Sequence, residues 1–161
     1  MSESTNDTAT TVKQRMQTAL TAAMKARDEV ALSALRQALS AMAVAETAGD
    51  VQVVLTDAQA LVVIAIEVRQ QHETADAFVT AGRPEQAERP RAEAALLQAY
   101  LPAALSDDDI AGLIAAEVAA AAADGATGMK AMGKVVAAVR AKAGATADGA
   151  KIAAMVKAAL A

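Results

Sequence analysis

The sequence contains no cysteine and no tryptophan, a single histidine, and only two aromatic side chains, Phe78 and Tyr100. Without cysteine the chain can form no disulfide, no thiolate metal site and no cysteine nucleophile, which is typical of proteins in a reducing compartment. With one histidine and scattered carboxylates, no ligand pair has a recognisable metal-binding spacing. The core must be built from Leu, Val, Ile, Met and Ala, and we expect no metal and no cofactor.

Long hydrophobic runs are also missing from the sequence. Residues 113–123 form the longest apolar stretch, but Glu117 interrupts it, and it is shorter than the roughly 20 residues that cross a bilayer. Residues 1–11 are polar and lack the basic-then-apolar pattern of a signal peptide. We therefore expect a cytoplasmic protein without a membrane partner, with residues 1–8 as a disordered N-terminal tail.

Alanine is abundant and occupies 47 of the 161 positions. It is the strongest intrinsic helix former, and its small side chain lets helices pack closely. Apolar residues recur every three or four positions almost throughout the chain, which is the period of an amphipathic helix. The sequence predicts an all-α protein with seven helices, near residues 9–27, 28–48, 57–81, 84–101, 106–124, 128–142 and 148–160.

The helical pattern is interrupted once, which predicts two parts. Leu101 and Pro102 end the fourth helix, and Ser106 followed by three aspartates is a strong helix-start signal. We predict an N-terminal bundle of about four helices, a short linker and a small C-terminal three-helix bundle, over residues 9–101, 102–105 and 106–161.

The N-terminal bundle carries two local predictions. Pro90 lies inside the fourth predicted helix, so residues 83–91 are expected to be kinked or partly irregular. His72 lies on the apolar stripe of the third helix and is expected to be partly buried rather than catalytic, because the sequence places no activated nucleophile and orienting acid beside it. This stripe predicts the packing face of the helix: Leu61, Ala65, Val68, His72, Ala75 and Val79.

The acidic cluster of the C-terminal half, Asp107 to Asp109, gives no catalytic chemistry either. Three carboxylates could hold Mg²⁺, but consecutive helical residues point about 100° apart, and helix capping accounts for all of them. The glycines between residues 125 and 133 follow no strand and match no phosphate-binding loop. We therefore expect no catalytic residue in the chain.

Charge is distributed unevenly along the chain, whose net charge is −4. Residues 1–124 carry nine cations and eighteen anions, a balance of −9, whereas residues 125–161 carry six cations and one anion, a balance of +5. The alternative explanation is uneven solvation of helix faces, but a basic surface can bind phosphates, and Gly133 would let a partner's backbone approach closely. The candidate RNA-binding residues are Lys130, Gly133, Lys134, Arg140, Lys142, Lys151 and Lys157.

Five groups of short motifs occur in order along residues 20–161. They are Lys25-Ala26-Arg27-Asp28 with Leu35-Arg36, Ala81-Gly82-Arg83-Pro84, Tyr100-Leu101-Pro102 followed by Leu105-Ser106, Met129-Lys130 with Met132-Gly133-Lys134, and Ala147-Asp148-Gly149. Together they resemble the GatB/YqeY family, which comprises stand-alone YqeY proteins and the C-terminal region of the B subunit of aspartyl/glutamyl-tRNA amidotransferase. The sequence departs from the family at Pro90-Arg91, where the family more often has charged helix formers. It also departs at Ala131 and Val136.

The resemblance implies an all-helical fold with an N-terminal bundle and a smaller C-terminal bundle. In the amidotransferase the similar region is a tRNA-contacting appendage, while glutamine hydrolysis and substrate activation belong to other domains and subunits. The family association is with translation and with carbon–nitrogen ligases that use glutamine as amido donor. No residue of this chain matches those chemical sites.

Three hypotheses follow, in this order. The first is a module that binds tRNA or another structured RNA through the basic C-terminal bundle, reading shape and backbone because residues 102–161 offer no aromatic side chain for stacking. The second is an adaptor that docks on a partner helix or on an acidic protein surface. The third is an amide-transferring enzyme, which only the family association supports. We expect no DNA partner, and the sequence leaves the oligomeric state open.

Overall fold

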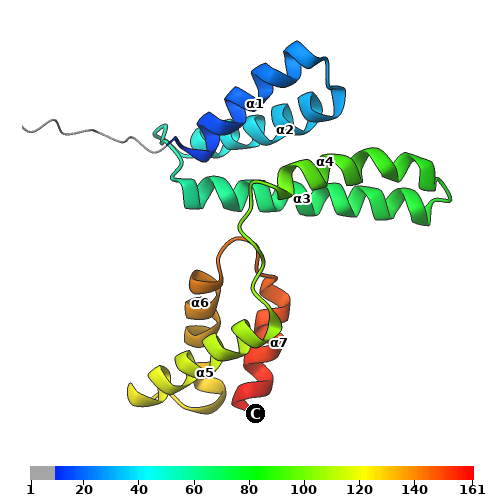
Figure 1. Cartoon of the computed structure of the whole chain (residues 1–161). Helices are drawn as coiled ribbons and strands as arrows, with labels where there is room; N and C mark the ends of the chain where they lie inside the picture. The colour runs from blue at the N-terminus through cyan, green and yellow to red at the C-terminus, as the bar shows by residue number, and fades with distance from the viewer. Residues whose placement is uncertain (1–9) are drawn as a thin grey trace, which may run out of the picture. The chain divides into compact units, whose positions relative to one another are not determined.

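Amphipathic helices account for most of residues 10–161. The computed structural model describes residues 10–161, and within them it contains seven α-helices, two short 3₁₀ helices and no strand (Figure 1). The predicted all-α fold with seven helices is confirmed. The predicted tail at residues 1–8 lies outside the described residues. The chain divides into two units, an N-terminal unit that ends at Leu101 and a C-terminal unit, Pro102–Ala161.

The N-terminal unit contains two helical hairpins. Its elements are α1 (Val12–Ala26), α2 (Glu29–Glu46), α3 (Asp57–Thr80), the 3₁₀ helix η1 (Pro84–Ala87) and α4 (Glu88–Gln98). Thr11 and Thr56 begin α1 and α3 with capping boxes, and the Asp28 side chain caps α2 by accepting a hydrogen bond from the N–H of Ala31. These side chains satisfy backbone donors that a helix start would otherwise leave without partners.

Aliphatic side chains and alanines form the core of the N-terminal unit. The helix α2 packs against all three other α-helices of the unit. The largest fully buried side chains are Met16, Leu35, Met42, Ile64 and Leu97. Burying such side chains contributes about 1.5–3 kcal/mol each relative to exposure, so this cluster is the main source of the unit's stability.

The packing face of α3 differs from the predicted stripe. Val68 and Ala75 are buried as predicted, but His72 is exposed and Val79 keeps 43% of its surface exposed. Instead, the face that packs on α2 and α4 includes the polar residues Glu67 and Gln71. The apolar residues of α3 itself lie on several of its sides. The periodicity of the sequence therefore could not identify which side packs against α2 and α4.

Pro90 lies within α4 without kinking it, because it is the third residue of that helix. The first four N–H groups of a helix have no intrahelical partner, so a proline there removes no hydrogen bond. The irregularity predicted for residues 83–91 takes the form of η1, which occupies the four residues before α4. The fourth α-helix is therefore shorter than the predicted 84–101.

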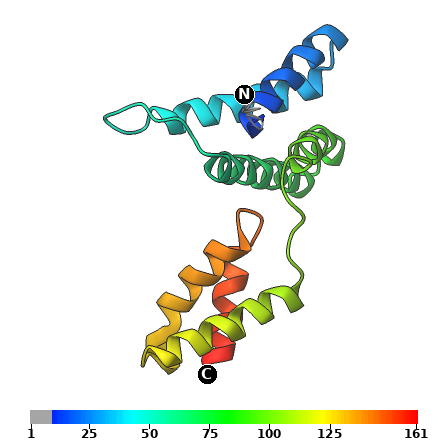
Figure 2. The same cartoon turned by 60° about the vertical axis from the view of Figure 1, so that its left-hand side comes forward.

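The C-terminal unit is a three-helix bundle with an aliphatic core. It consists of α5 (Asp107–Ala123), the 3₁₀ helix η2 (Gly128–Ala131), α6 (Met132–Ala143) and α7 (Gly149–Leu160), and Figure 2 shows it from a second direction. Each of the three α-helices packs against the other two. Its buried core comprises Ile110, Ile114, Ala121, Ala131, Val135, Val139, Ala143, Ile152 and Val156.

No single helix within residues 10–161 is long and apolar enough to cross a membrane. By length and composition, α5 reaches the span of a membrane only together with residues 128–143, and this pair is bent by 104°.

Candidate nucleic-acid interface

The seven predicted RNA-binding residues all belong to the C-terminal unit, where they form two groups. Lys130 lies in η2, and Gly133 and Lys134 follow in the first turn of α6; η2 also packs against α7, whose last turn carries Lys157. The second group begins about 9–12 Å beyond Lys134 along α6, given a rise of about 1.5 Å per residue. It consists of Arg140 and Lys142 in the last turn of α6 and Lys151 in the first turn of α7.

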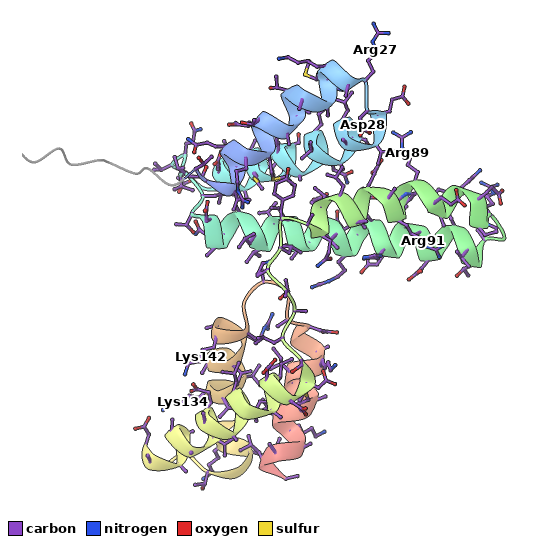
Figure 3. All side chains as sticks on the ribbon, viewed as in Figure 1. Arg27, Asp28, Arg89, Arg91, Lys134 and Lys142 are labelled. Atoms are coloured by element: carbon purple, nitrogen blue, oxygen red, sulfur yellow. The ribbon has the colours of Figure 1, made fainter. Side chains whose placement is uncertain are left out.

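Three of these cations form ion pairs with acids of the same unit. Lys134 pairs with Asp124, Lys142 with Glu117, and Lys151 with Asp107. Lys134 and Lys142 are labelled in Figure 3, toward the two ends of α6. The side chains of Lys134 and Asp124 are each more than half exposed, and the hydrogen bond from Lys134 lowers the pKa of the Asp124 carboxyl.

These pairs change the meaning of the charge split in the sequence. The balance of +5 after residue 124 omits the acids of α5, which the fold returns to the same unit as the lysines. Residues 102–161 carry six Lys and Arg against six Asp and Glu, so the C-terminal unit has no net charge. Any affinity for an anion must therefore come from the local arrangement of its cations rather than from a general excess of positive charge.

Lys130, Arg140 and Lys157 form no ion pair within residues 10–161, and all three are exposed. The Arg140 guanidinium lies against Gly149 at the start of α7, where an added Cβ would come within 3.0 Å of its Cζ atom. Gly149 thus provides the space that this guanidinium occupies. Lys130 and Lys157 project from the end of the unit at which α6 begins.

The start of α6 has no side-chain cap. A side chain caps α1, α2, α3, α5 and α7, whereas α6 with the preceding η2, like α4 with the preceding η1, has none. The first N–H groups of η2 and α6, together with the positive end of the helix dipole, favour an anion. Lys130 and Lys134 flank this end of α6, and a Cβ added at Gly133 would meet no atom within 4 Å. Backbone donors, two cations and open space therefore coincide here.

The other residues considered from the sequence have structural roles or none. Asp109 completes a capping box with Ser106, whose hydroxyl hydrogen bond lowers the pKa of the Asp109 carboxyl. His72 is exposed on α3. Within the described residues, no group of three His, Cys, Asp or Glu side chains is arranged to hold a metal ion.

Sequence reasoning missed a buried polar network in the N-terminal unit. Gln71 on α3 donates through its Nε2 atom to Gln37 Oε1 on α2 (2.9 Å) and to Glu93 Oε2 on α4 (3.0 Å). Arg89 in turn donates to Glu93 Oε1 (3.0 Å), and Figure 3 shows Arg89 and Arg91 leaving α4 on opposite sides. The network thus joins three helices through hydrogen bonds.

Glu67 lies at the α2 end of this network and is only 7% exposed. Burial raises the pKa of its carboxyl, although a hydrogen bond with Gln37 acts in the opposite direction. Its Oε2 atom has no hydrogen-bond partner among the described residues. The i, i+4 spacing of Glu67 and Gln71, beside the buried Ile64 and Val68, was the sequence signal that could have revealed this face.

A comparison of the sequence with models of known protein families identifies one family. A protein-family model described as "Yqey-like protein" matches residues 13–160, nearly the whole chain. The chain belongs to the YqeY-like family. The match includes both units, so the YqeY-like family accounts for the N-terminal hairpins as well as the C-terminal bundle. No curated protein sequence matches the chain.

Proposed function

We propose that this YqeY-like protein is a cytoplasmic, non-catalytic module of translation whose C-terminal unit binds tRNA or another structured RNA. One observation carries the proposal: the uncapped start of α6 lies between Lys130 in η2 and Lys134, beside the open surface at Gly133. A phosphate placed there would accept hydrogen bonds from backbone amides and pair with two ammonium groups.

The chemistry of this surface favours the nucleic-acid backbone over the bases. Lysines and backbone amides contact phosphates without regard to sequence, and residues 102–161 contain no aromatic side chain for base stacking. Lys157 extends the cationic surface from the neighbouring helix α7. A folded RNA presents phosphates in a fixed geometry, so recognition would depend on shape.

The ion pairs of the unit are compatible with this proposal. Exposed pairs such as Lys134 with Asp124 are worth little, so a phosphate can replace the carboxylate at small cost. The resemblance of the chain to the tRNA-contacting region of an amidotransferase B subunit adds support. The proposal takes no amide-transfer step from this resemblance.

The test is a titration of folded tRNA with the full-length protein at several salt concentrations. We expect the variant with Lys130→Glu and Lys134→Glu to bind more weakly. The slope of log K against log salt should be smaller in magnitude by about 1.5, since each lost phosphate contact contributes about 0.7–0.9. Duplex DNA of equal length is the matched nucleic acid, for which we expect weaker binding.

The control variant carries Lys25→Glu and Arg36→Glu, two exposed residues of the N-terminal unit. It changes the net charge of the protein by the same amount and should keep the affinity and the salt slope of the wild type. Equal losses in both double variants would show that only total charge matters. Unchanged binding after the Lys130 and Lys134 substitutions would refute the proposed surface.

A further inference from the structure

An apolar groove of about 540 Å³ runs along the N-terminal unit between α1, α2 and α4. The side of α1 that faces it carries four alanines, and α2 forms the floor with Ala31 and Leu35. Leu96, Ala99 and Tyr100 form the opposite side, in α4 and the residues just after it. With so many alanines in its walls, the groove can receive large side chains from outside.

The groove exists because α1 and α4 do not pack against each other. Each of them packs on α2, and Figure 1 shows α1 diverging from the α3–α4 pair toward its own C-terminal end. At the narrow end, the Arg15 guanidinium lies over the Tyr100 ring, 5.9 Å from the ring centroid.

Charges of opposite sign mark the two ends of the groove. Arg15 lies in the first turn of α1, and Asp28 follows the last turn, so about 17 Å of helix separates them. The N-terminal unit as a whole is acidic, with nine Lys and Arg against thirteen Asp and Glu in residues 1–101, a balance of −4. An acidic unit with an apolar groove is unfavourable for a polyanion, so this surface does not suit RNA.

We propose that the groove binds an amphipathic helix of a partner protein, with Leu, Ile, Met or Phe side chains inserted between α1 and α4. The partner helix has an acidic residue that pairs with Arg15 and a basic residue about eleven positions later that pairs with Asp28. An acid is favoured near the N-terminus of a helix and a base near its C-terminus, so the partner helix runs parallel to α1. This surface is separate from the RNA-binding surface proposed above, and neither proposal depends on the other.

The experiment uses a labelled synthetic helix of sixteen residues as the probe, with full-length protein and fluorescence anisotropy as the readout. The peptide carries Glu near its N-terminus, leucines at positions i, i+4 and i+7, and Lys eleven residues after the Glu. We expect saturable binding with a Kd below about 100 μM, and NMR amide shifts confined to α1, α2 and α4. The charge-reversed peptide, with Lys first and Glu last, should bind more weakly.

Two kinds of variant test the site. Ala22→Phe fills the groove from an exposed position of α1 and should weaken peptide binding at least about tenfold, because it builds a clash with the ligand. Ala77→Phe, on an exposed position of α3 outside the groove, is the matched control and should have no effect. Arg15→Gln and Asp28→Asn should each weaken binding about 2–5-fold, and Asn keeps the cap of α2.

Circular dichroism checks that each variant is folded, and sedimentation gives the oligomeric state. Equal binding by Ala22→Phe and Ala77→Phe, or no saturable binding of the peptide by the wild type, would overturn the proposal. A dimer of the wild type that Ala22→Phe dissociates would also overturn it, because the groove would then hold a second copy of the chain.

Discussion

The two units place their polar and charged residues in opposite ways. In the N-terminal unit, Glu67, Gln71 and Glu93 lie between helices and are each at most 7% exposed. In the C-terminal unit the buried core is entirely aliphatic, and the charges form exposed pairs such as Lys134 with Asp124. Buried polar groups restrict how helices can pack, since each must meet its partner, whereas exposed pairs exchange easily with outside ligands. We therefore infer that the buried polar groups of the N-terminal unit fix how its helices pack, and that the exposed charges of the C-terminal unit serve binding.

The largest expected effect comes from breaking the buried network. Glu93→Ala removes an acceptor from the buried Gln71 amide and leaves Arg89 unpaired, so we expect a loss of about 1–3 kcal/mol in the free energy of unfolding. Chemical denaturation followed by circular dichroism measures this loss. Glu88→Ala, at an exposed position of the same helix, and Lys134→Ala in the other unit should stay within about 0.5 kcal/mol. If Lys134→Ala costs as much as Glu93→Ala, the contrast between the units is wrong.

A smaller effect, dependent on pH, is expected at Glu67. Burial raises the pKa of this carboxyl in the folded state above the ordinary value of 4.5, so its contribution to stability is complete below that value and is lost as pH rises through the folded-state pKa. Glu67→Gln keeps the shape and removes the titration. We expect it to stabilise the protein by about 1 kcal/mol at high pH and to have no effect below the ordinary pKa.

The measurement is the free energy of unfolding of both proteins across a pH series. Glu73→Gln, on the exposed side of α3, removes a carboxyl without a burial effect and should leave the pH dependence unchanged. A stability difference between wild type and Glu67→Gln that is constant with pH would contradict the assignment of this dependence to Glu67.

Substitution of Gly112 and Gly133 distinguishes a structural role from a role in RNA binding within the C-terminal unit. A Cβ added at Gly112 in α5 or at Gly133 in α6 would meet no atom within 4 Å, so Gly→Ala should stabilise the protein by up to about 1 kcal/mol at either position. Only Gly133→Ala should weaken RNA binding, because only Gly133 lies at the proposed phosphate site. Thermal unfolding and the tRNA titration give the two readouts, and equal RNA affinity in both variants would remove Gly133 from the site.

The sequence predicted where the helices of this protein lie better than it predicted which side of each helix is buried. The helix-start signal at Ser106 and the abundant alanine located helices along the chain, because these signals are local. The face of α3 was predicted wrongly, since Glu67 and Gln71 are buried only through partners on α2 and α4 that no local pattern reveals. The groove beside Tyr100 could not be predicted either, because it depends on the angle between α1 and α4.

The candidate RNA-binding residues show the same limit. Their positions on α6 and α7 followed from helical spacing, but their electrostatic setting did not. The acids of α5 reach Lys134, Lys142 and Lys151 only through the tertiary packing of the bundle. A charge count along the chain therefore overstated the positive character of this unit.

The smallest expected effect is at Asp124, and it tests whether the exposed acids compete with RNA. Its carboxylate accepts a hydrogen bond from Lys134, which lowers its pKa, so at neutral pH it is ionised and occupies the ammonium group that a phosphate would contact. Asp124→Asn removes that charge. We expect tRNA affinity to rise about 2–4-fold, which corresponds to the small free energy of an exposed ion pair, without a change in thermal stability. Asp108→Asn is the control, because Asp108 is an exposed acid of α5 that forms no ion pair among the described residues. If both variants gain equally, the gain reflects net charge alone, whereas a gain confined to Asp124→Asn locates the competition at the start of α6.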